Sequence, residues 1–223
     1  MSKNGFDPSV YNDDLALKID WKMVPYTVCS MGREYDLVQT SPSRLKFIKS
    51  EHSRSTAMFL MFLGVVSLAI LLLSDSGGSV FGKLAVAAIA IVTFYYGFRL
   101  LKKGSEEKVF DKGSGYYRQG KENPDARGGH TSRYECRIAD IHAVQLLKSR
   151  LLPGSFIGHN GGIAIGSSNK YRVYQINLVL KSGKRVNVVC HGPAESAVLE
   201  DAKRVADFLE IPLWDATEYY LEI

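Results

Sequence analysis

The chain has 223 residues, a net charge of +5 and three cysteines. Its mild basic excess is not arranged as a dense basic stripe interleaved with aromatic residues, so the composition argues against a nucleic-acid partner. Cys29, Cys136 and Cys190 are few, scattered and odd in number. This usage is typical of reduced thiols in a cytoplasmic setting.

An N-terminal arm, residues 1–54, precedes the first long apolar run. Residues 1–14 are polar, which predicts a mobile segment. Residues 35–38 (YDLV) and 44–48 (RLKFI) alternate between apolar and polar side chains on either side of a TSPS turn. The pattern predicts two strands, the second of which leads directly into the apolar run.

Two apolar runs, at residues 56–73 and 80–101, are the strongest pattern in the chain. The first carries no charge, and the second carries only Lys83 and Arg99, both near its ends. About 18 apolar residues suffice for a helix to cross a bilayer. In hydrocarbon, a helix satisfies every backbone hydrogen-bonding group within its own segment. We therefore expect a transmembrane helical hairpin over residues 55–103. A pair of buried core helices and a cleaved signal peptide are the alternatives, and the length and position of the runs disfavour both.

Basic residues flank the outer ends of this hairpin, whereas the connection between the runs is nearly free of them. The positive-inside rule then predicts that both termini are cytoplasmic. The same basic rim, extended by two residues of the C-terminal tail, supplies candidate contacts for anionic lipid headgroups. These candidates are Arg44, Lys46, Lys49, Arg54, Arg99, Lys102, Lys103, Lys148 and Arg150.

Small residues within the spans predict close packing of the two helices, because small side chains let helix backbones approach each other. The candidates are Gly64, Ser67, Ala85 and Ala88. Neither span carries an ionisable residue near its middle. Transporters usually place such groups there, so transport is disfavoured.

The tail, residues 104–223, predicts a run of short strands followed by one helix. Strands are expected at residues 108–111, 116–118, 134–138, 140–148, 171–180 and 185–190. After Pro193, the residues Val198, Ala202, Val205 and Leu209 recur at helical spacing and form an apolar stripe. We expect an α+β membrane protein whose antiparallel sheet domain resembles a pleckstrin-homology (PH) domain closed by a C-terminal helix.

Residues 151–169 form a Gly- and Ser-rich insertion with apolar positions. Long loops in compact domains are often functional, so these positions are candidates for a partner or membrane-surface loop, and a flexible connection is the alternative. Gly161 and Gly166 have P-loop spacing, but Ser167 stands where the motif requires Lys, which argues against nucleotide binding. The apolar candidates are Phe156, Ile157, Ile163 and Ile165.

Four cysteine and histidine residues lie on or beside predicted strands: Cys136, His142, Cys190 and His191. Their spacing matches no familiar zinc pattern. A Cys–His hydrolase would also need a thiolate and an oxyanion hole, and the sequence supplies only the residue types. We predict no catalytic residue, no metal site and no cofactor.

The order of these features resembles a bacterial family of two-helix membrane proteins with a cytoplasmic PH-like domain. It is more distantly similar to the photosystem I assembly factor of chloroplasts and cyanobacteria. The resemblance is carried by residues 37–47, Phe110, Asp111, Gly115, Arg118, residues 138–141, Val144, residues 174–189, Ala202, Ala206, Phe208, Leu209, Ile211 and Pro212. The insertion at 151–169 departs from the compact assembly-factor pattern. The resemblance implies a bacterial inner-membrane location and a scaffolding or assembly role without enzyme activity.

The functional expectation is therefore a non-enzymatic, membrane-anchored interaction module that contacts membrane lipid and binds a protein partner or a second copy of itself. An anionic-lipid-binding PH-like module is the first alternative. A membrane-bound hydrolase using Cys190 or His191 is the second.

Overall fold

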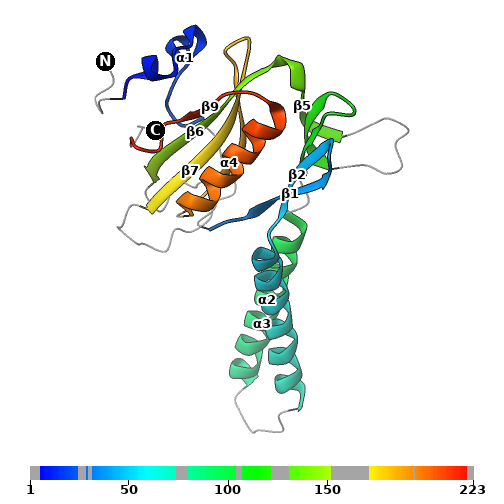
Figure 1. Cartoon of the computed structure of the whole chain (residues 1–223). Coiled ribbons are helices and arrows are strands. Elements are labelled where there is room, and N and C mark those ends of the chain that lie inside the picture. The colour runs from blue at the N-terminus through cyan, green and yellow to red at the C-terminus, as the bar shows by residue number, and fades with distance from the viewer. Residues whose placement is uncertain are drawn as a thin grey trace.

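A pair of long helices interrupts a β-sheet and extends away from it (Figure 1). The computed structural model describes residues 6–24, 29, 32–73, 80–103, 107–121, 131–151, 171–192 and 194–219. In these residues the strands form two sheets of five and four strands, here called sheet A and sheet B. The predicted loop candidates Phe156, Ile157, Ile163 and Ile165 lie outside the described residues.

Sheet A is an antiparallel meander in which each strand pairs with the next along the chain. Its strands are β1 (Tyr35–Ser41), β2 (Arg44–Lys49), β3 (Glu107–Asp111), β4 (Tyr116–Lys121) and β5 (Thr131–Arg137). Although β2 and β3 are far apart in sequence, they pair with Arg44 opposite Asp111 and Phe47 opposite Lys108. The arm strands and the tail strands therefore belong to one sheet.

The helices α2 (Glu51–Leu73) and α3 (Val80–Lys103) lie between β2 and β3 in the chain. Both predicted spans are confirmed as helices, and each extends beyond the apolar run. Windows of 19 and 20 residues within them have mean hydropathies of 2.6 and 1.7 and are long and apolar enough to cross a membrane. Only 11% of each window is buried, so these are not core helices of the chain.

Sheet B lies against sheet A and has the strand order β8-β7-β6-β9. Its strands are β6 (Ile141–Leu151), β7 (Tyr171–Leu180), β8 (Arg185–His191) and β9 (Leu213–Asp215), and only β9 runs parallel to its neighbour. A 3-10 turn, η2 (Ile138–Asp140), links β5 to β6. The strand predictions in the tail are confirmed, with β7 ending at the predicted residues. The turn between β7 and β8 uses Gly183 at a φ of 80°, a backbone conformation that favours glycine.

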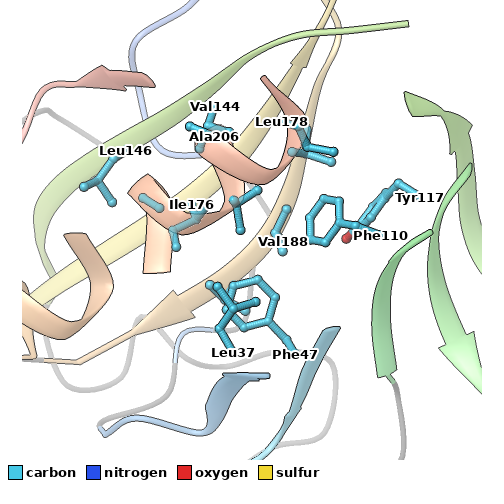
Figure 2. Packing of buried hydrophobic residues seen from close by; sticks show 14 of the residues in the cluster. Leu37, Phe47, Phe110, Tyr117, Val144, Leu146, Ile176, Leu178, Val188 and Ala206 are labelled. Atoms are coloured by element: carbon cyan, nitrogen blue, oxygen red, sulfur yellow. The ribbon is translucent and has the colours of Figure 1, made fainter. Parts of the chain in front are cut away.

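The main core lies between the two sheets and the helix α4 (Glu195–Leu209). Phe47 and Phe110 from sheet A reach toward Ile176 and Val188 of sheet B (Figure 2). The predicted stripe of α4 is confirmed. It is buried in this core and comprises Val198, Ala202, Val205, Ala206 and Leu209.

Residues 6–24 of the N-terminal arm fold against the domain, although the polar sequence predicts a mobile segment over residues 1–14. It forms a 3-10 turn, η1 (Pro8–Tyr11), and a short helix, α1 (Asp14–Lys18), each capped by an aspartate. Phe6 is 7% exposed and packs against Trp21, with ring centroids 4.7 Å apart. The prediction of mobility is therefore wrong for this part of the arm, because its aromatic residues bury themselves against the outer face of sheet B.

Candidate functional site

The contact between α2 and α3 is made through two glycines. A Cβ atom at Gly64 would lie 2.9 Å from the carbonyl oxygen of Ala90, and one at Gly97 would lie 2.8 Å from that of Ala57. Ala57 and Ala90 are themselves buried. The backbones thus approach closely where small residues face each other at seven-residue intervals, as small-residue packing requires.

Two of the four predicted packing residues do not take part in this contact. Gly64 is buried in it, whereas Ser67 is half-buried and its hydroxyl donates to the Leu63 carbonyl of its own helix, 2.8 Å away. Ala85 and Ala88 are exposed. Within the chain, the rotation of α3 turns Gly97 rather than Ala85 or Ala88 toward α2, and a packing role for these two alanines in the membrane stays a prediction.

The hairpin joins the domain at a polar cluster around Ser50, the residue between β2 and α2. Its N–H donates to the Glu34 carbonyl at 2.8 Å and its hydroxyl donates to the Arg33 carbonyl at 3.0 Å. The Arg33 guanidinium donates to both carboxylate oxygens of Asp201 on α4, at 3.0 and 3.2 Å. The Glu34 N–H donates to Nδ1 of His191 at the end of β8, at 3.3 Å. We call Arg33, Ser50, His191 and Asp201 the junction cluster.

Burial dominates the electrostatics of the junction cluster. It raises the pKa of Asp201 to about 6, even though Arg33 and Arg204 act in the opposite direction. Burial also lowers the pKa of His191 to about 4, assisted by the positive charges of Lys108 and Arg33. His191 is therefore neutral at physiological pH, whereas Asp201 titrates close to it.

The basic residues predicted to contact lipid do not form one patch. Lys46 lies 3.5 Å from Glu107, and Lys148 is 8% exposed with its Nζ atom 3.7 Å from Glu195. The ammonium of Lys148 is thus buried and paired within the domain, and its contact with a lipid headgroup stays a prediction. Arg99 and Arg150 are exposed, whereas Arg44 and Lys49 are half-buried in β2. The side chains of Arg54, Lys102 and Lys103 lie outside the described part of the structure.

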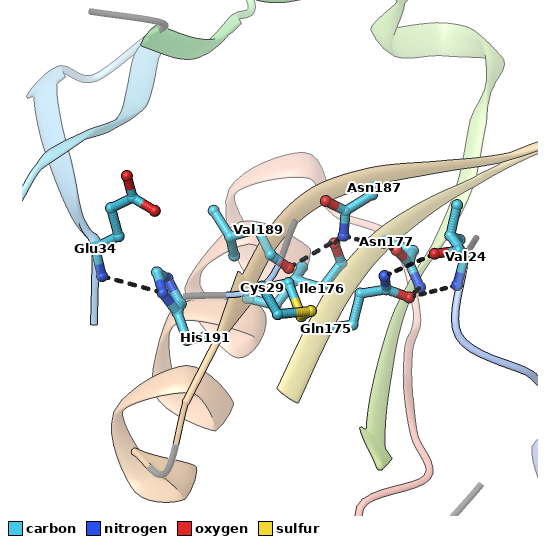
Figure 3. The surroundings of a disulfide bond; sticks show 10 residues. Val24, Cys29, Glu34, Gln175, Ile176, Asn177, Asn187, Val189 and His191 are labelled. Atoms are coloured by element: carbon cyan, nitrogen blue, oxygen red, sulfur yellow. Dashed lines mark hydrogen bonds between the residues drawn. A yellow bond between two sulfur atoms is a disulfide. The ribbon is translucent and has the colours of Figure 1, made fainter. Parts of the chain in front are cut away.

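A disulfide joins Cys29 of the arm to Cys190 of β8, across 161 residues of sequence (Figure 3). The prediction that the thiols are reduced is wrong for these two, because the arm folds back over sheet B and brings them together. Cys136 is not disulfide-bonded, and burial raises its pKa to about 11. Neither arrangement provides the reactive thiolate that a cysteine hydrolase would need.

The arm covers the outer face of sheet B through a strip of buried amides, which we call the amide strip. The Gln175 side chain pairs with the backbone of Val24, accepting from its N–H at 2.8 Å and donating to its carbonyl at 3.4 Å (Figure 3). Asn177 donates to the side-chain oxygens of Gln145 and Gln175, at 3.3 and 3.1 Å. The strip consists of the buried Gln145, Gln175 and Asn177 and the half-buried Asn187, whose amide donates to Asn177 at 3.1 Å.

Aromatic and charged contacts hold the two ends of the arm beside this strip. Tyr11 stacks on Trp21 with ring centroids 5.3 Å apart, and Trp21 lies 5.9 Å from Trp214. Nε2 of His142 lies 2.7 Å from the Asp13 carboxylate, which also caps α1. Arg185 donates to the Lys22 carbonyl at 2.6 Å. The aromatic residues Phe6, Tyr11 and Trp21, in a largely polar segment, are the sequence signal that could have indicated this packing.

The cysteines and histidines considered for metal binding do not converge. His142 bonds Asp13, and Cys190 is in the disulfide. Within the described ranges, no group of three or more His, Cys, Asp or Glu side chains is placed to hold a metal ion. In comparisons with known proteins, no family model, no curated protein and no solved structure matches the chain.

Proposed function

We propose that the chain is a non-enzymatic, membrane-anchored interaction or assembly module. The hairpin crosses the membrane and holds the α+β domain at its surface, where the domain binds a protein partner or a second copy of itself. One observation carries this proposal: the hairpin is inserted between two strands that pair with each other. Ser50 alone separates β2 from α2. The domain is thus fixed beside the membrane rather than carried on a long tether, which suits a platform for assembly.

The outward-facing surface of the hairpin supports membrane insertion. Large apolar side chains cover it, including Leu73 at 86% and Phe81 at 85% exposure. A soluble protein rarely exposes so continuous an apolar surface to water. The basic residues at the outer ends of the hairpin favour cytoplasmic termini in a bacterial inner membrane.

The strand order of the domain supports a PH-like fold. Strands β2–β5 form one antiparallel run, β6–β8 form a second, and α4 closes the space between them. The hairpin enters at the first connection of this series, while β1, β9 and residues 6–24 are additions to it. This arrangement agrees with the resemblance to the two-helix bacterial family and to the photosystem I assembly factor.

An anionic-lipid-binding module is the second candidate. The exposed Arg99, near the domain end of α3, favours it. The ion pairs of Lys46 and Lys148 count against a continuous basic patch. Binding of the protein to vesicles with and without anionic lipid tests this candidate function directly. An Arg99→Gln variant is compared there with Lys203→Gln, a matched change on the exposed side of α4.

Mild crosslinking of the intact protein in native membranes, followed by affinity purification and mass spectrometry, tests the proposal. We expect recovery of a protein partner, or a second copy, in a fixed ratio. Recovery of a monomer with enriched anionic lipid would support the lipid-binding candidate instead. The detergent-solubilised protein crosslinked at the same concentration serves as the control for non-specific capture.

A further inference from the structure

The disulfide and the charge distribution of the chain point to different compartments when each is considered alone. The basic flanks of the hairpin place the domain in the cytoplasm. Disulfides are rare there, and those that form are usually transient and redox-sensing or catalytic. Both observations are satisfied if the bond between Cys29 and Cys190 forms and breaks reversibly.

The bond fastens the arm over the outer face of sheet B. Cys29 lies in the arm, C-terminal to residues 6–24, and Cys190 belongs to β8, an edge strand of that sheet. The two cysteines share a cluster with Phe6 and Met23 of the arm and with Leu147 and Val173 of the sheet. Breaking the bond therefore releases the arm from the only covalent link that holds it on this face within the described residues.

The outer face of sheet B carries buried amides, which favours reversible opening of residues 6–24. The inner face of β7 carries Tyr174, Ile176 and Leu178 in the main core, whereas its outer face carries the amides Gln175 and Asn177 between Val173 and Val179. Amides that lose a protein partner can bond water instead, so uncovering them costs less than uncovering an apolar core. The apolar contacts beside these amides form two clusters separate from the main core, so residues 6–24 can open locally without global unfolding.

We propose that Cys29–Cys190 is a site of reversible thiol–disulfide exchange that controls whether residues 6–24 cover the outer face of sheet B. The inference rests on the cytoplasmic topology given under the proposed function. The reductant is a protein dithiol of the thioredoxin class, and the oxidant is a disulfide of the cellular thiol pool.

The exchange proceeds in two displacements. A thiolate of the reductant attacks one sulfur of Cys29–Cys190 and forms a mixed disulfide, and the other cysteine leaves as a thiolate that takes up a proton. The second thiolate of the reductant then attacks the mixed disulfide, releasing the second cysteine as a thiol and leaving the reductant oxidised. Two electrons and two protons pass to the pair. Because Cys29 and Cys190 are only 5% and 6% exposed, a brief local fluctuation that exposes one sulfur must precede the attack, and stable release of residues 6–24 follows once the bond is broken.

Limited trypsin digestion of the full-length protein in membranes tests the structural half of this proposal. The exposed Lys18 and Lys22 provide cleavage sites within the arm. We expect reduction by a small dithiol to speed cleavage there by about tenfold or more, because residues 6–24 open more often once the disulfide no longer holds them. Cys29→Ser should give the fast rate with or without reductant, whereas Cys136→Ser should behave as the unaltered chain does.

Alkylation of thiols in intact cells tests the redox half. With Cys136→Ser as the background, a maleimide that adds mass reports the state of the remaining pair. We expect the oxidised fraction to rise when a thiol oxidant is added and to fall after its removal. A pair that stays oxidised throughout, or reduced throughout, would overturn the proposal, and the former would place the domain in an oxidising compartment. Unchanged recovery of a protein partner from Cys29→Ser would leave the proposed interaction function standing even if the exchange fails.

Discussion

The hairpin exposes the same kinds of large apolar side chain that the domain buries. In α2, Phe59 and Phe62 are 62% and 66% exposed, whereas Phe47 and Phe110 of sheet A are fully buried. Small residues occupy the contact between the helices, and large ones fill the core between the sheets. The domain therefore buries its large apolar side chains, as folding in water requires, whereas the hairpin exposes them, as the proposal that it crosses a membrane requires.

The domain should lose the most from deletion of a buried side chain. We expect Leu146→Ala to lower the free energy of unfolding by about 2–5 kcal/mol, because Leu146 is 1% exposed in the main core. Leu17, which is 56% exposed on α1, provides the matched control, and Leu17→Ala should change the value by less than about 0.5 kcal/mol. Denaturant unfolding of the detergent-solubilised protein measures both. Equal losses would mean that burial does not distinguish the two sites.

The hairpin should respond to charge as a lipid-facing surface does. Ile89 is 66% exposed near the middle of α3. We expect Ile89→Arg to reduce insertion by about 2.5–3.5 kcal/mol, the cost of Arg at the centre of a membrane helix. The fraction of protein that resists extraction from membranes by alkaline carbonate reports this loss. Leu17→Arg on the domain should leave that fraction unchanged. If Ile89→Arg also left it unchanged, the surface of α3 around Ile89 would face water.

The junction cluster, where the two regions meet, should show two opposing pH dependences. The pKa of Asp201 rises from 3.8 to about 6 on folding, so the folded state binds this proton more readily and gains stability as the pH falls from 6 to 4. The pKa of His191 falls from 6.5 to about 4, so the unfolded state is protonated first and stability is lost as the pH falls through the same range. The two contributions therefore act in opposite directions over nearly the same pH range and offset each other in the unaltered chain.

Single substitutions should separate these two contributions. We expect Asp201→Asn to lose stability steeply between pH 6.5 and 4, because only His191 then titrates. His191→Gln should instead gain stability as the pH falls from 6 to 4. Denaturation midpoints measured at several pH values report both slopes, and parallel profiles for the two variants would contradict the assignment.

The packing of the hairpin should be sensitive to single methyl groups at the contact. Gly97→Ala places a Cβ atom against the Ala57 carbonyl and the Met61 side chain, and overpacking of this kind costs about 1–3 kcal/mol. Gly82→Ala, at an exposed position of the same helix, should be neutral or stabilising by up to about 1 kcal/mol, since alanine favours helix. Thermal unfolding in detergent, followed by circular dichroism, compares them. Equal melting temperatures for the two variants would contradict the close approach of the two helix backbones at Gly97.

The sequence predicts the local elements well and the long-range contacts poorly. Residues 171–180 alternate between apolar and polar side chains and end at turn residues, and β7 has these bounds. The pairing of β2 with β3 follows from no local pattern, because the hairpin separates them. The phase of the helix contact could have been found from Ala57 with Gly64 and from Ala90 with Gly97, which recur seven residues apart.

The contacts on the outer face of sheet B could not be predicted from the sequence. Gln175 and Val24 are 151 residues apart, and no periodicity in the polar arm indicates that they pair. Three cysteines allow three different pairs, and only the folded chain selects Cys29 with Cys190. The junction cluster likewise joins residues from β8, α4 and the segment before β1, whose shared position depends on both sheets being in place.

Cysteine accessibility in sealed membranes tests most directly whether the hairpin spans a bilayer and holds the domain on one side. In a Cys136→Ser background, Val80→Cys marks the start of α3, and Arg150→Cys marks an exposed position on the domain. We expect an impermeant maleimide to label the two sites from opposite sides of the membrane, with Arg150→Cys reached from the cytoplasm. Labelling of both sites from the same side would contradict a membrane-spanning hairpin.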